Sequence, residues 1–371
     1  MSKNNNNTPH LRFPGFTGEW VEKKLGESVG SFKTGKLDAN AMVEGGEYRF
    51  YTCAKDFSFI DSYAFEGDCI MIAGNGAHLG YVHHYNGKFN AYQRTYVLSD
   101  FNCDSNYLEC CIRRFLPDRI RQEKKEGNMP YIVLSTLTDM LLYFPPSPEE
   151  QKKIADCLSE MDNLISAQSQ KVELLKDQKK GMMQELFPQK GETTPRLRFP
   201  EFTGEWKEYE FGDCFEIGSG RDYKHLDEGH IPVYGSGGYM CSVNDYLYDG
   251  ESACIGRKGT INNPILLSGK FWTVDTLFYT YNYVNTTAYF IYLLFQNIDW
   301  MKHNEAGGVP SLSKNIIKKI KVFIPSLTEQ QKISDCLSAL DDLIASETKQ
   351  LEALKDHKKG LMQQLFPQPA K

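Results

Sequence analysis

The sequence lacks the features that define membrane-spanning, secreted or disulfide-stabilised proteins. No apolar run approaches the roughly 18 residues needed to cross a bilayer. The opening MSKNNNNTPH contains no apolar segment, which predicts the absence of a secretory signal. The ten cysteines include no C-x-x-C pair, and a disulfide framework is typical of much shorter secreted chains. We therefore expect buried free thiols in a cytoplasmic protein.

Complete nucleotide-binding and nuclease motifs are also missing. GSFKTGKL at 30–37 resembles a phosphate-binding loop, but Leu37 stands where Ser or Thr would hold magnesium. Asp118 and Glu123 are five residues apart in a predicted helix, with no strand pair to place them around a metal. The dinucleotide fingerprint and the Asn-Pro-Pro-Tyr type of methyltransferase segment are absent. The sequence therefore predicts no active site.

Metal binding is equally unsupported by residue spacing. Cys69, His78, His83 and His84 lie close together in the sequence, but they lack the spacing of a zinc site and a second group of ligands. We therefore predict no metal centre and no cofactor held by this chain.

Length and charge allow several domains and a local nucleic-acid surface. A chain of 371 residues predicts two or three domains, each able to bury its own core. The formal net charge of −6 argues against a simple nucleic-acid coat. It permits DNA binding through local basic loops, or with partners that supply positive charge.

Two sequence segments occur twice. Residues 8–20 (TPHLRFPGFTGEW) and 194–206 (TPRLRFPEFTGEW) differ at only two positions. Residues 146–189 and 325–368 are identical at 26 of 44 positions. The chain therefore reads head, variable segment and helix, then head, variable segment and helix again. Two such long units are too few for a solenoid.

The closing repeats predict long helices with a coiled-coil seam. Apolar residues recur at alternating spacings of four and three, a period of 3.5 that is typical of such a seam. Each helix should run about 36 residues, or about 54 Å. The predicted seam residues are Ile154, Leu158, Met161, Ile165, Gln168, Val172 and Leu175 in the first copy, and Ile333, Leu337, Leu340, Ile344, Glu347, Leu351 and Leu354 in the second.

The economical partner for each helix is its near-copy in the same chain, packed antiparallel, although core packing or homodimerisation is the usual role of a single amphipathic helix. In that register Gln168 and Glu347 fall near the middle. Polar seam residues fix register at a cost in stability, or they are simply positions that tolerate solvent.

The variable segments, 21–145 and 207–324, share a skeleton but few side chains. GKF occurs at 87–89 and again at 269–271. Both segments are rich in Tyr, Phe, Ile and Val interrupted by Gly and Asn, which predicts short strands and turns. Helices are expected over 106–125 and 287–304. One scaffold carrying two sets of loops indicates that the two segments recognise different things.

Those loops carry side chains suited to nucleic acid. Arg, Lys, Asn and Gln pair with base edges or phosphates, and neighbouring glycines let the backbone approach closely. For any single residue, an ordinary solvated loop position is an equal alternative. The candidate DNA-binding residues are Lys33, Lys36, Asn75, His78, Tyr92, Gln93 and Arg94 in the first segment, and Arg221, Tyr223, Lys224, Arg257, Lys258 and Thr260 in the second.

The whole chain resembles the specificity (S) subunit of Type I restriction–modification systems. The resemblance rests on LRFPGFTGEW and LRFPEFTGEW, on the helix openings at 149–154 and 328–333, and on the closings KKGMMQELFPQ and KKGLMQQLFPQ. It implies an α+β protein in which two mixed α/β target recognition domains are separated by two long antiparallel helices in a coiled coil. The two halves would be related by a pseudo-two-fold repeat.

The resemblance also implies domain boundaries, a function and partners. The domains expected are head repeats at 1–20 and 190–206 (the latter with a linker), recognition domains at 21–145 and 207–324, and helices at 146–189 and 325–368. Each recognition domain would read half of a split, asymmetric double-stranded DNA site. The subunit would bind two methyltransferase (M) subunits, which methylate adenine using S-adenosylmethionine, and two restriction (R) subunits, which use ATP and magnesium.

Such a subunit would itself be non-catalytic, and it would be cytoplasmic and associated with the nucleoid when bound to DNA. The main alternative is a coiled-coil adaptor with two ligand-binding domains and no role at DNA. A self-contained nuclease is a second alternative.

Overall fold

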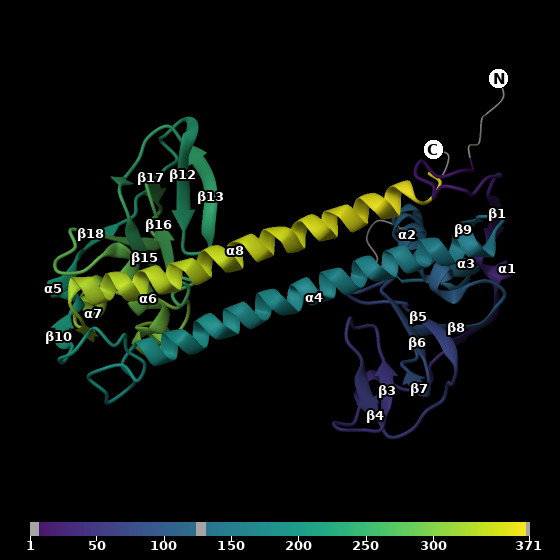
Figure 1. The fold of residues 1–371 in the computed structure, drawn as a ribbon, viewed down its shortest axis with the longest axis horizontal. Helices are drawn as coiled ribbons and strands as arrows, with labels where there is room; N and C mark the ends of the chain where they lie inside the picture. Colours follow the sequence, from purple (N-terminus) through teal and green to yellow (C-terminus); the bar gives the residue numbers. More distant parts are fainter. Residues whose placement is uncertain (1–6, 124–130, 369–371) are drawn as a thin grey trace. The chain divides into compact units, whose positions relative to one another are not determined.

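The computed structural model describes residues 7–123 and 131–368. It divides into two compact units, Met1–Ser169 with Lys349–Lys371, and Gln170–Thr348. Unit 1 therefore takes in the start of the first long helix and the end of the second. Unit 2 takes in the end of the first and the start of the second. Figure 1 shows the helices and strands of both units, coloured along the sequence.

Unit 1 contains small sheets and short helices beside its portions of the long helices. A four-stranded antiparallel sheet has the order β2-β8-β5-β6, a three-stranded sheet the order β4-β3-β7, and β1 pairs with β9. The elements are β1 (Val21–Lys24), α1 (Leu25–Ser28), β2 (Val29–Thr34), a 3₁₀ turn (Ala39–Ala41), β3 (Tyr48–Tyr51), β4 (Ser58–Ile60), β5 (Asp68–Ala73), β6 (Val82–Asn86), β7 (Phe89–Ala91), β8 (Thr95–Phe101), α2 (Ser105–Glu123), α3 (Leu134–Thr138), β9 (Leu141–Phe144) and α4 (Pro148–Leu186).

Strand β5 shows why the core of unit 1 forms where it does. Its sequence DCIMIA is apolar without alternation, which is typical of a strand covered on both faces. Ile70 and Ile72 belong to the cluster that includes α2, whereas Cys69 and Met71 belong to a second cluster with Tyr51 and Phe89. Successive residues thus point to opposite faces, as the pleat requires.

Unit 2 repeats this arrangement with a fourth strand in its second sheet. Its sheets have the orders β11-β18-β15-β16 and β13-β12-β17-β14, and β10 pairs with β19. The elements are β10 (Lys207–Glu210), α5 (Phe211–Cys214), β11 (Glu216–Ser219), β12 (Glu228–Gly235), β13 (Gly238–Val243), β14 (Tyr248–Asp249), β15 (Ser252–Gly256), β16 (Ile265–Leu267), β17 (Lys270–Thr273), β18 (Leu277–Tyr281), α6 (Ala288–Asn297), a 3₁₀ turn (Trp300–His303), α7 (Lys314–Lys318), β19 (Lys321–Ile324) and α8 (Leu327–Gln364).

Corresponding contacts recur in both units. The parallel pairing of β3 with β7 matches that of β12 with β17, and the pairing of β1 with β9 matches that of β10 with β19. The lysine of each GKF motif covers an exposed tyrosine ring: Lys88 lies 4.6 Å from the Tyr63 ring centre, and Lys270 lies 4.7 Å from that of Tyr246. The two variable segments therefore share one scaffold.

Each unit's core is completed by the far end of a long helix. In unit 1, Phe366 packs edge-on against Trp20, with ring centres 6.4 Å apart, beside Ile154 and Leu158 at the start of α4. In unit 2, Phe187 packs edge-on against Trp206 at 6.2 Å. The start of one long helix thus lies beside the end of the other within each unit.

Ion pairs repeat across the helices in the same way. In unit 2, Lys179 binds both carboxylate oxygens of Asp341, at 2.6 and 2.8 Å. In unit 1, the repeat-equivalent Lys358 donates to Asp162. Glu347 is buried and accepts a hydrogen bond from Lys171 at 2.6 Å. All fourteen predicted seam residues are buried or partly buried.

The two head repeats are fixed by buried ion pairs. Arg12 donates to both oxygens of Glu150 at 2.7 and 2.8 Å, and Arg198 donates to both oxygens of Glu329 at 2.7 and 2.9 Å. The same arginines donate to carbonyl oxygens of Gly18 and Gly204 within the heads. Each head is therefore anchored to the first turn of a long helix.

None of the helices in the described ranges is long and apolar enough to cross a membrane.

Candidate nucleic-acid interface

A four-residue turn organises the candidate residues of unit 1. In the turn Tyr92–Thr95, the amide of Thr95 donates to the carbonyl of Tyr92 at 2.8 Å. The amide of Gly74 donates to the carbonyl of Arg94, and that of Gln93 to Leu37, both at 2.9 Å. The loops after β2, β5 and β7 therefore meet at this turn. The backbone segments that carry Lys36, Asn75, Gln93 and Arg94 are thereby brought together.

The remaining candidates of unit 1 are placed less centrally. Lys33 is exposed on β2, where it pairs with Val97. His78 is partly buried in the 74–80 loop, and its carbonyl accepts from the amide of Tyr81. Gln93, Arg94 and Lys36 are exposed, and Tyr92 and Asn75 are partly buried.

Unit 2 has the same turn with different side chains. In the turn Val274–Leu277, the amide of Leu277 donates to the carbonyl of Val274 at 3.0 Å. The amide of Arg257 donates to the carbonyl of Thr276, and that of Arg221 to Thr273, both at 2.8 Å. We call Tyr92–Thr95 and Val274–Leu277 the shared turn, because each is the meeting point of the loops in its unit.

The shared turn requires glycine in the loop that crosses it. A Cβ atom on Gly35 would lie 1.8 Å from the carbonyl oxygen of Ala91, and one on Gly220 would lie 1.9 Å from that of Val274. No side chain fits in such a space. Each glycine is followed by an exposed basic residue, Lys36 or Arg221, which the close approach holds beside the turn.

Positive charge converges on the Arg257 loop. The Arg257 guanidinium lies 5.9 Å from the Phe278 ring centre, and Lys314 lies 5.8 Å from the same ring. Burial lowers the pKa of Lys314, and repulsion from Lys318 and Arg257 lowers it further. A phosphate placed here would relieve that repulsion, so the loop suits an anionic ligand.

The other candidates of unit 2 differ in exposure and in their contacts. Lys224, Lys258 and Thr260 are exposed, and Lys258 forms a strand-like bridge with Ser311. Tyr223 packs against the small core cluster that contains Trp272, so its ring contributes to the packing of its own domain.

Sequence reasoning missed Asp275, Thr276 and Lys314. The sequence criterion favours Arg, Lys, Asn and Gln, and an aspartate such as Asp275 does not meet it. A positional signal was present, since Gln93 and Asp275 each lie four residues after the phenylalanine of a GKF motif.

Comparison with known proteins identifies the family. The family model described as Type I restriction modification DNA specificity domain matches residues 17–176 and again 203–356. The chain belongs to this family. The resemblance seen in the sequence is thereby confirmed, and the double match coincides with the repeated scaffold.

Individual specificity subunits are similar over most of the chain. The EcoDI specificity subunit of Escherichia coli is 27% identical over 358 residues, covering 85% of this chain and 80% of that protein. A putative MjaX specificity subunit of Methanocaldococcus jannaschii is 27% identical over 285 residues, covering 70% and 67%. The crystal structure of a Type I S subunit from M. genitalium matches with a TM-score of 0.69 at 20% identity, covering 98% of this chain and all of that one. The last comparison shows a shared fold.

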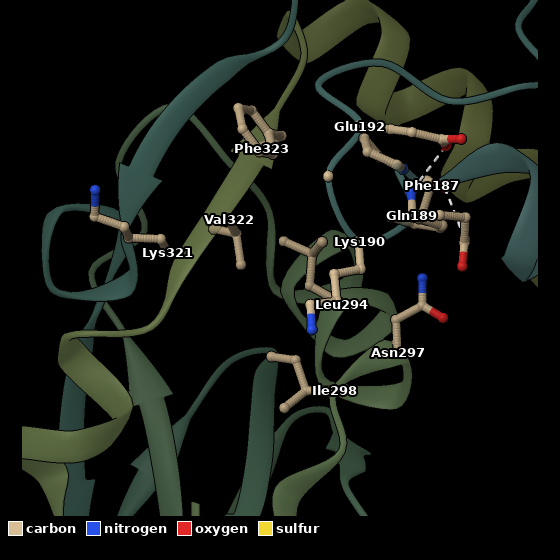
Figure 2. Close-up of a pocket in the computed structure, with 12 residues that line it drawn as sticks. Phe187, Gln189, Lys190, Glu192, Leu294, Asn297, Ile298, Lys321, Val322 and Phe323 are labelled. Carbon is tan, nitrogen blue, oxygen red and sulfur yellow. Dashed lines mark hydrogen bonds between the residues drawn. The ribbon is translucent and has the colours of Figure 1, made fainter. Parts of the chain in front are cut away.

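A pocket in unit 2 is lined by no residue of the shared turn. It has a volume of about 400 Å³ and is bounded by residues 187–192 after α4, the end of α6 and β19. Leu294, Ile298 and Val322 face this space (Figure 2). None of the candidate DNA-binding residues lines it. Among the described residues, no group of three or more His, Cys, Asp or Glu is placed to hold a metal ion.

In unit 1, His84 forms an ionic cluster with two carboxylates. Its Nε2 lies 2.7 Å from Asp68 Oδ1 and its Nδ1 lies 3.0 Å from Glu109 Oε2, while Arg113 donates to the other oxygen of Glu109. Both ring nitrogens can donate only in the imidazolium form. Burial opposes protonation, but the hydrogen bonds to the two carboxylates outweigh it and raise the pKa of His84.

This cluster predicts a pH-dependent contribution to stability. Because the folded state raises the pKa of His84, its contribution is fully present below about pH 6.5 and disappears as the pH rises through the folded-state value. His84→Gln should cost about 1.5–3 kcal/mol at pH 6, and the cost should shrink at alkaline pH. Urea unfolding of both proteins at several pH values measures the difference. A cost that is independent of pH would contradict the imidazolium assignment.

Proposed function

We propose that this chain is the non-catalytic DNA sequence-recognition subunit of a Type I restriction–modification complex. In this proposal, each unit reads one half of a bipartite, asymmetric DNA site. One observation carries it: the loops of both units meet at the same backbone turn, but the side chains there differ. Gln93 and Arg94 occupy the turn in unit 1, whereas Asp275 and Thr276 occupy it in unit 2. A common scaffold with different reading groups suits two half-sites with different letters.

The long helices would pair as an antiparallel coiled coil that sets the gap between half-sites and docks the methyltransferase subunits. The seam periodicity and the repeated Lys–Asp pairs, Lys179–Asp341 and Lys358–Asp162, support this role. Exposed leucines also recur at equivalent positions, with Leu164 at 54% and Leu343 at 41% exposure on the helices. A partner that binds twice needs two such equivalent surfaces.

The same proposal assigns the chemistry to partners. Two methyltransferase subunits would supply adenine methylation with S-adenosylmethionine, and two restriction subunits would supply ATP- and magnesium-dependent translocation and cleavage. With a net charge of −6 on this chain, those partners would also contribute phosphate contacts. Such a subunit would work in the cytoplasm, at the nucleoid when bound to DNA.

Exchange of one variable segment tests this function. Replacing residues 207–324 with the corresponding segment of another specificity subunit should change one half of the methylated site and leave the other half unchanged, because each unit carries its own reading loops. Mapping methylated adenines in cells that express the hybrid with its methyltransferase subunits gives the result. The reciprocal exchange of residues 21–145 is the matched control and should change the opposite half.

Three outcomes would overturn the proposal. A change in both half-sites would contradict the modular assignment. Absence of any salt-sensitive, sequence-selective DNA binding by the unmodified complex would favour a coiled-coil adaptor with two ligand-binding domains. DNA cleavage or methyl transfer by the purified chain alone would contradict the non-catalytic role.

A further inference from the structure

We propose that Asp275 is a specificity-determining residue of unit 2, and that it accepts a hydrogen bond from the exocyclic amino group of a cytosine in its half-site. The proposal rests on the DNA-recognition function above. It adds a residue that is absent from the candidates identified in the sequence, and it names the base that this residue would contact.

The position of Asp275 comes from the backbone around it. Backbone hydrogen bonds join this turn and the residue before it to three other segments. The amides of Arg221 and Arg257 donate to the carbonyls of Thr273 and Thr276, and the turn's own Val274 amide donates to the carbonyl of Tyr234 at 2.9 Å. A turn fixed from several sides presents its exposed side chain in a defined place. Asp275 is exposed, whereas the preceding Val274 is 8% exposed.

Unit 1 supplies an independent reference for the same position. Tyr92 donates to the carbonyl of Tyr51 as Val274 donates to that of Tyr234, both at 2.9 Å, and Gly74 donates to Arg94 as Arg257 donates to Thr276. By this superposition of contacts, Gln93 in unit 1 corresponds to Asp275 in unit 2. The scaffold keeps the position and changes a side chain that both donates and accepts into one that only accepts.

The charge of Asp275 decides what it can contact. Its neighbours are cationic: Arg257 Nη1 donates to the backbone oxygen of Asp275 at 3.4 Å, and Arg221 and Lys258 are exposed on the adjoining loops. Those cations are suited to bind phosphates, whereas phosphates would repel the Asp275 carboxylate. In the major groove, the hydrogen-bond donors offered by bases are the amino groups of cytosine and adenine, and carboxylates pair with cytosine N4. Gln93, with both a donor and an acceptor, suits adenine.

The test uses the full chain in complex with its methyltransferase subunits and a pool of duplex DNA with randomised sequence. The unmodified complex should select one bipartite site. Asp275→Asn keeps the shape but adds a donor, so it should weaken the preference for cytosine at one position of one half-site by about tenfold and favour adenine there. Gln93→Glu, the reciprocal variant, should change one position in the other half-site from adenine toward cytosine.

The controls separate failure of this inference from failure of the proposed function. Asp249→Asn, an exposed aspartate on β14 of the same unit, should select the unmodified site. If the unmodified complex selects no sequence, the proposed function fails. If it does select a site, and Asp275→Asn selects the same site with the same cytosine preference, Asp275 is not a reading residue. Loss of affinity that is equal for all sequences would also overturn the inference, because it is the result expected of a phosphate-proximal residue.

Discussion

Lengthening both long helices by one heptad is expected to move the two methylated half-sites apart by at most three base pairs. Seven residues added after Gln168 and seven after the repeat-equivalent Glu347 keep the seam in phase. The helices would grow by about 10 Å at 1.5 Å per residue, and B-DNA rises about 3.4 Å per base pair. Methylated-adenine mapping in cells with the methyltransferase subunits measures the gap, and the half-site letters should not change.

A heptad added to α4 alone is the matched control for this experiment. It shifts the Lys179–Asp341 pairing relative to the rest of the seam, so the protein should be strongly destabilised rather than altered in specificity. The DNA must also rotate to follow the new spacing, which lowers affinity. An active lengthened protein that methylates sites with the original gap would show that the helices do not set the spacing.

Arg198→Met is expected to destabilise the protein by about 3–5 kcal/mol, because it leaves a buried carboxylate without its cation. The Glu329 side chain is 2% exposed and also accepts a hydrogen bond from the Trp206 indole at 3.2 Å. That hydrogen bond and the first turn of α8 cannot offset the lost charge. Denaturant unfolding with two-state analysis of each transition gives the change in free energy.

Two variants identify the cause of that loss. Arg196 lies two residues before Arg198 and forms an exposed ion pair with Glu192. Arg196→Met removes this pair and should cost no more than about 1 kcal/mol. The double variant Arg198→Met with Glu329→Gln should recover much of the stability, since no buried charge remains. If Arg198→Met and Arg196→Met cost the same, the ion pair is not what anchors the head.

The long helices were the most predictable part of the fold. A period of 3.5 residues sustained over several heptads is typical only of long helices that pack along a seam, and the structure places the helices at Pro148–Leu186 and Leu327–Gln364. The one-turn helices α1 and α5 could not be predicted, because four residues contain no complete amphipathic period. Strand positions were predictable only as a class, since each strand is short and many, like β5, lack alternation.

The candidate interface was predictable by composition but not by geometry. Residue type marks Arg257 and Arg221 as candidates, and the structure places both of their backbones at the shared turn. The sequence does not mark Asp275, because its significance comes from hydrogen bonds of its neighbours that join residues 19, 40 and 52 positions apart. Tyr223 is a candidate because it lies in the same loop as Arg221 and Lys224, and its ring packs against a local core. Position in a fold and residue type are separate pieces of information.

The placement of Phe366 in the core beside Trp20 has a consequence for synthesis of the protein on the ribosome. Domains commonly fold from the N-terminus as they emerge, but unit 1 needs residues that are translated some 340 positions after Trp20. Its aromatic surface must stay without its native cover until nearly the whole chain is made. Nascent chains stalled before residue 361 should therefore expose Trp20 and Tyr107 to chaperones, whereas unit 2, whose Phe187 is translated before Trp206, can fold without that delay.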